Sequence, residues 1–402
     1  MPWMLRVFLS FAPLLFVAYF YLGLRTHQAL VELFSLSSAQ VRWVLLGVIG
    51  YLNLHPLLLF ALQALGFGNF YRTVRAGNRV WDLFFTYPFW IGLIVVAEVV
   101  PWLLLIDVVK FPFYPFFERF RAVWTLTQHR VTLVLLALMV FYVLVRVVHD
   151  TTSIKVRRER LQVRDLPRSL NGLKIVHISD VQVDPRTTAR KLRRYVRKVN
   201  KLKPDVVFFS GDLVTSGIKY IDVAAEGLAE LRPRYGTYAC LGDHDIWAGA
   251  HLVTERLTEN GIHVFENANQ KVAVGRDTLL VTILTNTYRH RPNLDTLHFL
   301  MGQQPRGAVD ILLTHQPSES VIELAEDHGY HLFLAGHTHG GQIVLKPFGF
   351  TLTPAKLETP YYRGINYVGQ MLVSINSGLG FTIAPLRFRA PAEITLITLL
   401  AP

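Results

Sequence analysis

The feature that most constrains this chain is a series of four long apolar stretches in its first 150 residues. They cover residues 7–24, 43–67, 83–106 and 131–148, and each is close to the roughly 18–20 residues that a helix needs to cross a bilayer. Three more stretches follow the first, and no small-residue cleavage site follows it directly, so we do not expect its removal as a signal peptide. Residues 1–150 are therefore predicted to be a transmembrane anchor with four spans.

The charge content rises after this region. Residues 1–150 contain 11 Lys and Arg and 6 Asp and Glu, whereas residues 151–402 contain 30 and 23. Residues 151–164 are expected to be a basic linker to a folded domain at 165–402. With 51% hydrophobic and 17% charged residues, the chain is not disordered, and an ordinary soluble enzyme is disfavoured. The single cysteine, Cys240, excludes an internal disulfide framework and a cysteine-based zinc site.

Lys and Arg beside the spans favour one orientation in the membrane. Nine lie on the side that holds the N-terminus, the second loop and the segment after the last span, and six lie on the other side. We therefore expect an integral protein of the inner (cytoplasmic) membrane whose C-terminal domain faces the cytoplasm.

The net charge of +12 suggests an anionic partner, and a helix expected at residues 186–203 carries nine basic residues and no acidic ones. Its apolar residues recur at spacings of three and four, which indicates one buried face and one positive face. Such a charge run is often only a solvated face. Because membrane spans accompany it, an anionic lipid surface is the functional interpretation that we favour. No nucleic acid partner is expected, since no nucleic-acid-binding motif or array of stacking aromatics is present.

After residue 160, short apolar runs alternate with amphipathic stretches, which predicts a layered α/β domain. Strands are expected at 173–178, 205–209, 237–241, 278–284, 310–313, 331–334, 371–375 and 394–399, and helices at 187–202, 220–231, 250–260 and 317–327. Five of the strands end in polar side chains, namely Asp180 and Gln182, Asp212, Asp243 with His244 and Asp245, His315, and His337 with His339. A single Asp at a strand end is usually a turn residue. Because ligands bind outside the carboxyl ends of strands in α/β sheets, the whole series predicts one shared site.

In this order, HISDVQ, SGD, GDHD, TH and GHTHGG resemble the signature of the calcineurin-like metallophosphoesterase superfamily. The motifs GHTHGGQ, SGLG and APAEITLITL look like the membrane-associated bacterial branch of that family. The resemblance runs from about residue 165 to the end. It implies a β-sandwich of two mixed sheets flanked by helices, with two divalent metal ions at one edge. The expected fold is thus α/β, with a four-helix transmembrane region followed by a metallophosphoesterase domain.

The resemblance also implies roles for the residues of the site. At the first metal these are Asp180, Gln182, Asp212 and His339, and at the second they are Asp212 as a bridging carboxylate, Asp243, His315 and His337. His244 matches the residue that protonates or stabilises the leaving oxygen, and we expect Asp245 to orient that imidazole. Two cations clamp a phosphoryl group and lower the pKa of a bound water. The implied activity is hydrolysis of a phosphomonoester, a phosphodiester or a pyrophosphate.

Two positions depart from the family pattern, which has histidine at 182 and asparagine at 243. Gln182 offers a neutral oxygen in place of an imidazole nitrogen, and Asp243 adds a negative charge. A ligand set richer in oxygen predicts Mn²⁺, with Mg²⁺, Fe and Zn²⁺ as alternatives. If these departures abolish turnover, the alternative is a catalytically degenerate membrane scaffold or a sensor of phosphate ligands.

Residues 343–362, which follow the GHTHGG motif, are apolar and rich in proline. Beside a phosphate-cleaving site they favour a substrate with an acyl tail, although a packed structural loop explains them equally well. The predicted function is a membrane-bound phosphoesterase with a phosphorylated substrate, for which a lipid or a lipid-linked head group is one candidate.

Overall fold

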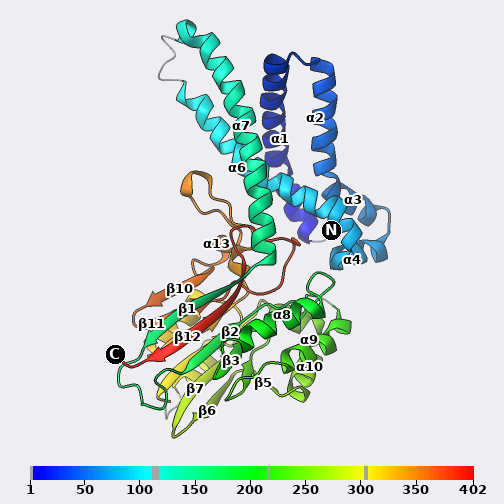
Figure 1. The fold of residues 1–402 in the computed structure, drawn as a ribbon. Helices are drawn as coiled ribbons and strands as arrows, with labels where there is room; N and C mark the ends of the chain where they lie inside the picture. The colour runs from blue at the N-terminus through cyan, green and yellow to red at the C-terminus, as the bar shows by residue number, and fades with distance from the viewer. Residues whose placement is uncertain (1–2, 111–116, 216, 303–306) are drawn as a thin grey trace. The chain divides into compact units, whose positions relative to one another are not determined.

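A computed structural model describes residues 3–110, 117–215, 217–302 and 307–402 (Figure 1). The chain forms two compact units. The helical unit contains Met1–His149 together with Val344–Leu352, and the α/β unit contains Asp150–Ile343 and Thr353–Pro402.

The helical unit is built from apolar helices. They are α1 (Trp3–Phe34), α2 (Ser38–Leu52), α3 (Leu54–Ala64), α4 (Gly68–Gly77), α5 (Arg79–Trp81), the π-helical η1 (Asp82–Thr86), α6 (Tyr87–Val109) and α7 (Phe117–Thr152), whose last residues belong to the α/β unit. Within the described residues, Phe11–Phe34, Arg79–Val109 and Glu118–Thr152 are long and apolar enough to cross a membrane. The pair α2 and α3, bent by 56° at Asn53, makes a fourth span if it is counted as one. These helices overlap the four stretches predicted from the sequence, and the second stretch corresponds to the bent pair.

The α/β unit contains two six-stranded sheets. The first has the order β1 (Ile154–Gln162), β12 (Ala392–Leu400), β2 (Lys174–Ile178), β3 (Val206–Phe209), β4 (Thr237–Ala239) and β5 (Ile262–Val264). The second has the order β10 (Gly364–Val368), β11 (Met371–Ile375), β9 (Leu332–Ala335), β8 (Val309–Thr314), β7 (Asp277–Leu284) and β6 (Ala268–Val274). Strands β2 to β5 are mutually parallel, as are β7, β8, β9 and β11. The site-bearing strands of each sheet therefore end at the same edge.

Helices cover the outer face of each sheet, and the two sheets pack against each other. Helices α8 (Ala189–Asn200), α9 (Ile221–Ala229) and α10 (Asp243–Glu259) pack on the first sheet, and α11 (Leu294–Gly302) and α12 (Glu319–Asp327) pack on the second. The unit also contains the short helices η3 (Ile218–Tyr220), η4 (His339–Gly341) and α13 (Ala355–Glu358). A core between the sheets includes Phe208, Val281 and Leu334, all fully buried. Each such side chain contributes about 1.5–3 kcal/mol relative to leaving it exposed. The expected β-sandwich flanked by helices is confirmed.

The region expected to be a linker, residues 151–164, instead contains β1. Its nine residues pair in parallel register with β12, from Ile154 opposite Ala392 to Gln162 opposite Leu400. The guanidinium of Arg157 donates two hydrogen bonds to the carboxylate of Glu393, at 3.0 and 2.9 Å. The basic residues therefore lie on a sheet edge, where charge discourages further strand pairing.

Candidate metal centre

Loops that follow parallel strands supply the polar side chains of the site. Asp180 lies after β2, Asp212 after β3, and Asp243 is the first residue of α10, after β4. His315 follows β8 directly, and His337 lies two residues after β9. Because the parallel strands of a sheet point the same way, their carboxyl ends bring such residues together. The order of the motifs predicts this grouping.

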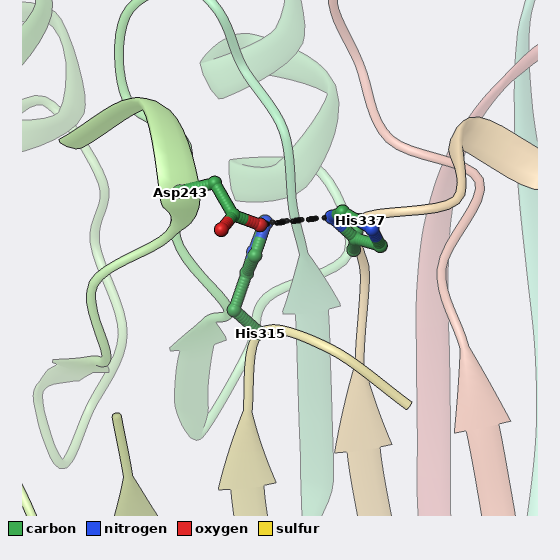
Figure 2. Close-up of side chains that lie close together, drawn as sticks. All are labelled: Asp243, His315 and His337. Atoms are coloured by element: carbon green, nitrogen blue, oxygen red, sulfur yellow. Dashed lines mark hydrogen bonds and ion pairs between the residues drawn. The ribbon is translucent and has the colours of Figure 1, made fainter. Parts of the chain in front are cut away.

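Asp243, His315 and His337 form one group of potential metal ligands, in which one ligand atom from each lies within 4.8 Å of the others. Nδ1 of His337 lies 3.1 Å from Oδ2 of Asp243, and Nε2 of His315 lies 3.5 Å from the same oxygen. Figure 2 shows the three side chains converging from the start of α10 and from the segments that follow β8 and β9. Imidazole nitrogens and a carboxylate oxygen are a donor set suited to a divalent transition metal.

Asp180, Asp212 and His315 form a second group with the same 4.8 Å limit. His315 is common to both groups, and its Nε2 lies 3.6 Å from Oδ2 of Asp212. The carboxylate of Asp212 is thus close to the shared histidine. Its role as the bridging ligand stays a prediction.

Gln182 and His339 lie on the Asp180 side of the cluster. Nε2 of His339 is 3.3 Å from Oδ1 of Asp180. The Gln182 amide nitrogen donates to Oδ2 of Asp212 at 3.1 Å and lies 3.2 Å from Nε2 of His339, while its Oε1 is buried without a hydrogen-bond partner. A 180° rotation of the amide exchanges the two atoms and presents the expected oxygen. All seven expected ligands therefore lie in one cluster.

His244 and Asp245 share the first turn of α10 but make different contacts. Nδ1 of His244 lies 2.5 Å from the carbonyl oxygen of Thr215, which fixes the plane of the ring. The carboxylate of Asp245 accepts hydrogen bonds from the N–H groups of Asp212, Leu213 and Gly242, at 2.8, 2.8 and 2.9 Å. The expectation that Asp245 orients the His244 imidazole is therefore wrong. Asp245 caps α10 and ties the β3 loop to the β4 loop.

The backbone is left-handed at five of the expected ligands. The angle φ is 49° at Asp180, 45° at Gln182, 61° at Asp212, 69° at His337 and 49° at His339. For residues with a Cβ this conformation is uncommon and costs roughly 1–2 kcal/mol each. Such conformations persist only where the surroundings enforce them, and they cluster at functional sites. The backbone thus marks the same place as the side chains.

Two motif glycines allow the loops to approach this closely. A Cβ added to Gly242 would lie 2.2 Å from Oδ1 of Asp212, and one added to Gly336 would lie 1.7 Å from Oγ of Ser179. Both distances are far below van der Waals contact. Glycine is therefore needed at these positions for steric reasons.

The donor atoms of the cluster fit a cation. Asp180, Asp212 and Asp243 are at most 2% exposed, and Oδ1 of Asp180 is buried without a hydrogen-bond partner. Three buried carboxylates in one cluster are costly unless positive charge compensates them. Divalent metal ions would supply that charge, and the residues present would hold them.

A protonated histidine can also compensate the negative charge of these carboxylates. Burial opposes the charged form of His337, but hydrogen bonds to Asp243 and Glu358 raise its pKa to about 10. Burial would raise the pKa of Asp243, but the hydrogen bond from His337 and the charge of His315 lower it to about 2. Metal binding at this group therefore competes with a proton on His337.

The sequence analysis missed two residues that contact His337. Oε1 of Glu358 lies 3.0 Å from its Nε2, and the hydroxyl of Tyr288 donates to the same carboxylate oxygen at 2.6 Å. Glu358 is the only acidic residue between Asp327 and Glu393, and this isolation is the signal that could have identified it.

Arg387 was also missed. Its guanidinium is fully buried and donates to backbone carbonyls of His339, Ser377, Gly378, Gly380 and Ala390. It thereby fixes the SGLG loop beside His339. Arg387 and Arg389 stand in an apolar segment, and nothing in the sequence distinguishes Arg387 for such a role.

Comparison with known proteins identifies relatives of this chain. The family model for calcineurin-like phosphoesterases matches residues 173–341. A transmembrane protein with a metallophosphoesterase domain from Danio rerio is 33% identical over 285 residues, which cover 68% of this chain and 62% of that protein. The chain thus spans about three fifths of this relative's length.

A second relative and a solved structure are also similar to this chain. The metallophosphoesterase YkuE of Bacillus subtilis (strain 168) is 30% identical over 239 residues, which cover 58% of this chain and 81% of that protein. A solved structure described as a novel archaeal phosphodiesterase matches 51% of this chain and 84% of its own, with a TM-score of 0.30 and 14% identity. From the sequence relatives and the family model, the chain belongs to the calcineurin-like metallophosphoesterases.

Proposed function

We propose that this protein is a membrane-bound, metal-dependent hydrolase of phosphate esters or pyrophosphate. The observation that carries the proposal is the cluster itself, in which five potential ligands form two groups joined by His315. Gln182 and His339 lie beside these groups, and His244 lies on the adjoining helix turn. Two divalent cations, when bound, supply Lewis-acid stabilisation of the phosphoryl oxygens and acidify water.

The chain's own residues hold the reacting groups in place. Asp180, Gln182, Asp212 and His339 are assigned to one cation, and Asp212, Asp243, His315 and His337 to the other. The P–O bond to the leaving group breaks as the oxygen of water bonds to phosphorus, and the water releases one proton to the solvent. His244 has its Nδ1 held by the carbonyl of Thr215, which leaves Nε2 to give a proton to the leaving oxygen.

The donor set supports Mn²⁺ as the preferred metal. Three carboxylates and an amide oxygen are hard ligands, and they outnumber the three imidazoles. Mg²⁺, Fe and Zn²⁺ are the alternatives that metal analysis should distinguish.

A lipid or lipid-linked phosphate is the substrate class that we favour, with the metal centre on the cytoplasmic side of the inner membrane. Exposed apolar side chains follow the GHTHGG motif, and Phe350 and Leu357 are 72% and 89% exposed. Helix α8 buries Leu192, Tyr195, Val196 and Val199 and exposes Arg190, Arg193, Arg194 and Arg197. Anionic head groups complement such a surface.

A second candidate function is a phosphate sensor without turnover. The Gln182 amide favours it, because in the orientation present its N–H groups face Asp212 and His339 rather than offering an oxygen to a cation.

Hydrolysis of p-nitrophenyl phosphate and bis-p-nitrophenyl phosphate by the detergent-purified protein distinguishes the two. We expect turnover with Mn²⁺ that EDTA and Asp212→Asn abolish. A long-chain phosphatidate and its water-soluble short-chain analogue then test the preference for a lipid. Tight metal binding without turnover on any of these substrates would favour the sensor.

A further inference from the structure

One segment of the metallophosphoesterase sequence belongs to the helical unit. Val344–Leu352 begins three residues after the GHTHGG motif, yet it forms one compact unit with the apolar helices. The segment closes on itself, since Leu345 and Leu352 exchange two backbone hydrogen bonds of 2.9 Å. It is therefore a compact hairpin.

The hairpin contacts a buried carboxylate of α6. Glu98 lies in the candidate span Arg79–Val109 and is 2% exposed. Its Oε1 accepts a hydrogen bond of 3.0 Å from the backbone N–H of Lys346. One turn further along α6, Trp102 packs edge-on against Phe348, with ring centroids 4.8 Å apart. Carboxylates inside membrane spans are rare and usually functional, so this contact calls for a role.

Both ends of the hairpin lead directly to the candidate metal centre. His339 precedes Val344 by five residues, and Glu358, which contacts His337, follows Leu352 by six. At the base, the hydroxyl of Thr353 donates to the carbonyl of Gly341 at 3.0 Å. A Cβ on Gly341 would lie 2.4 Å from that hydroxyl oxygen, so the base has little freedom to move.

We propose that Glu98 and Trp102 are positioning residues that hold the hairpin Val344–Leu352 on α6 and thereby fix His339 and Glu358 for metal binding and phosphoester cleavage. The inference rests on the proposed function. It makes the membrane helices part of the catalytic protein, where the sequence suggested an anchor alone. A carboxylate acts here through a backbone N–H, so an amide side chain at the same position can replace it.

The test uses the full chain in nanodiscs of phosphatidylethanolamine and phosphatidylglycerol. Glu98→Ala should accelerate hydrogen exchange at the Lys346 amide and lower both Mn²⁺ affinity and kcat for p-nitrophenyl phosphate by about 10-fold, the effect typical of removing an outer support of a metal site. Glu98→Gln should recover most of both, because its amide oxygen still accepts the N–H. Trp102→Ala should act in the same direction. Glu118→Ala, at a side chain 85% exposed, is the matched control and should change nothing.

Unchanged exchange at Lys346 in a folded Glu98→Ala protein would overturn the attachment. Faster exchange with unchanged Mn²⁺ affinity and kcat would overturn the coupling. If the wild-type protein binds Mn²⁺ but hydrolyses nothing, the proposed function fails, while the effect of Glu98→Ala on Mn²⁺ affinity still decides this inference.

Discussion

The two groups of potential ligands in the candidate metal centre differ in how the surrounding protein supports them. Residues outside the group of Asp243, His315 and His337 form hydrogen bonds with its members. Gln316 donates to Asp243 at 2.8 Å, and Glu358 contacts His337. On the other side, Oδ1 of Asp180 and Oε1 of Gln182 are buried without partners. Hydrogen bonds from the protein therefore preorganise the Asp243 group, whereas these two oxygen atoms on the Asp180 side would gain a partner from a bound cation.

This difference predicts an order of loading. The Asp243 group should bind a metal ion at a lower metal concentration, because hydrogen bonds from Gln316 and Glu358 already hold its side chains in place. The Asp180 group has a neutral amide where the family has an imidazole, so it should bind more weakly. The predictions below test this contrast, beginning with the residue closest to both groups.

The largest loss is expected for Asp212→Asn. Its carboxylate lies beside Gln182 and His315 and accepts the N–H of His244 at 2.8 Å. Removing this charge should weaken both metals and cost several kcal/mol of transition-state stabilisation, about 10³-fold in kcat. Steady-state kinetics with metal analysis checks it, with Asp327→Asn on the surface as the control. Loss of only one metal with normal turnover would show that Asp212 serves a single group.

His244→Gln should lower kcat by about 10²- to 10⁴-fold and leave the metal content unchanged. The loss should be greater for an alkyl phosphate than for p-nitrophenyl phosphate, because the poorer leaving group depends more on a proton. Rate measurements on both esters test this. An equal loss on both would argue against proton donation.

Asp245→Ala should reduce stability more than it changes chemistry. Three backbone N–H groups would lose their acceptor, and at about 1 kcal/mol or more for each buried group the cost is about 3 kcal/mol. Denaturant unfolding measures this. Asp222→Ala is a suitable control, since this residue forms a surface ion pair with Arg256, and a similar small loss in both variants would contradict the capping role.

The smallest effect is expected for Gln182→His, which restores the family residue. It should tighten the weaker site by about 10-fold, which corresponds to about 1.4 kcal/mol. Calorimetric titration with Mn²⁺ should show the second binding step moving toward the first. If the tighter step changes instead, the assignment of the two groups is reversed.

The sequence predicted the parts of this fold whose signal is local. Apolar runs located the long apolar helices and the buried parallel strands, and strand-end motifs located seven side chains that the structure brings together. Strand β1 was mistaken for a linker because Lys155, Arg157, Arg158, Glu159 and Arg160 give it a polar composition. Its pairing with β12 and the Arg157–Glu393 ion pair join residues more than 230 positions apart. Only tertiary structure reveals such partners.

The same reason explains the missed site residues. Tyr288 and Glu358 come from loops without a motif, and each matters only because His337 lies beside it. The contact proposed for Asp245 failed because sequence neighbours on a helix turn project in different directions, and backbone N–H groups of two other loops were nearer.

The left-handed backbone of the ligand loops has a consequence for folding. The surrounding structure stabilises those conformations only after β2, β3 and β9 have come together. The ligand loops should therefore become ordered late in folding and lose their structure early in unfolding. A cation bound by these loops would stabilise the native state. At a free concentration 100 times its Kd it would add about 2.7 kcal/mol to the free energy of unfolding. Heat resistance should therefore follow metal supply, and a cell that withholds the metal would reduce the lifetime of the protein together with its activity.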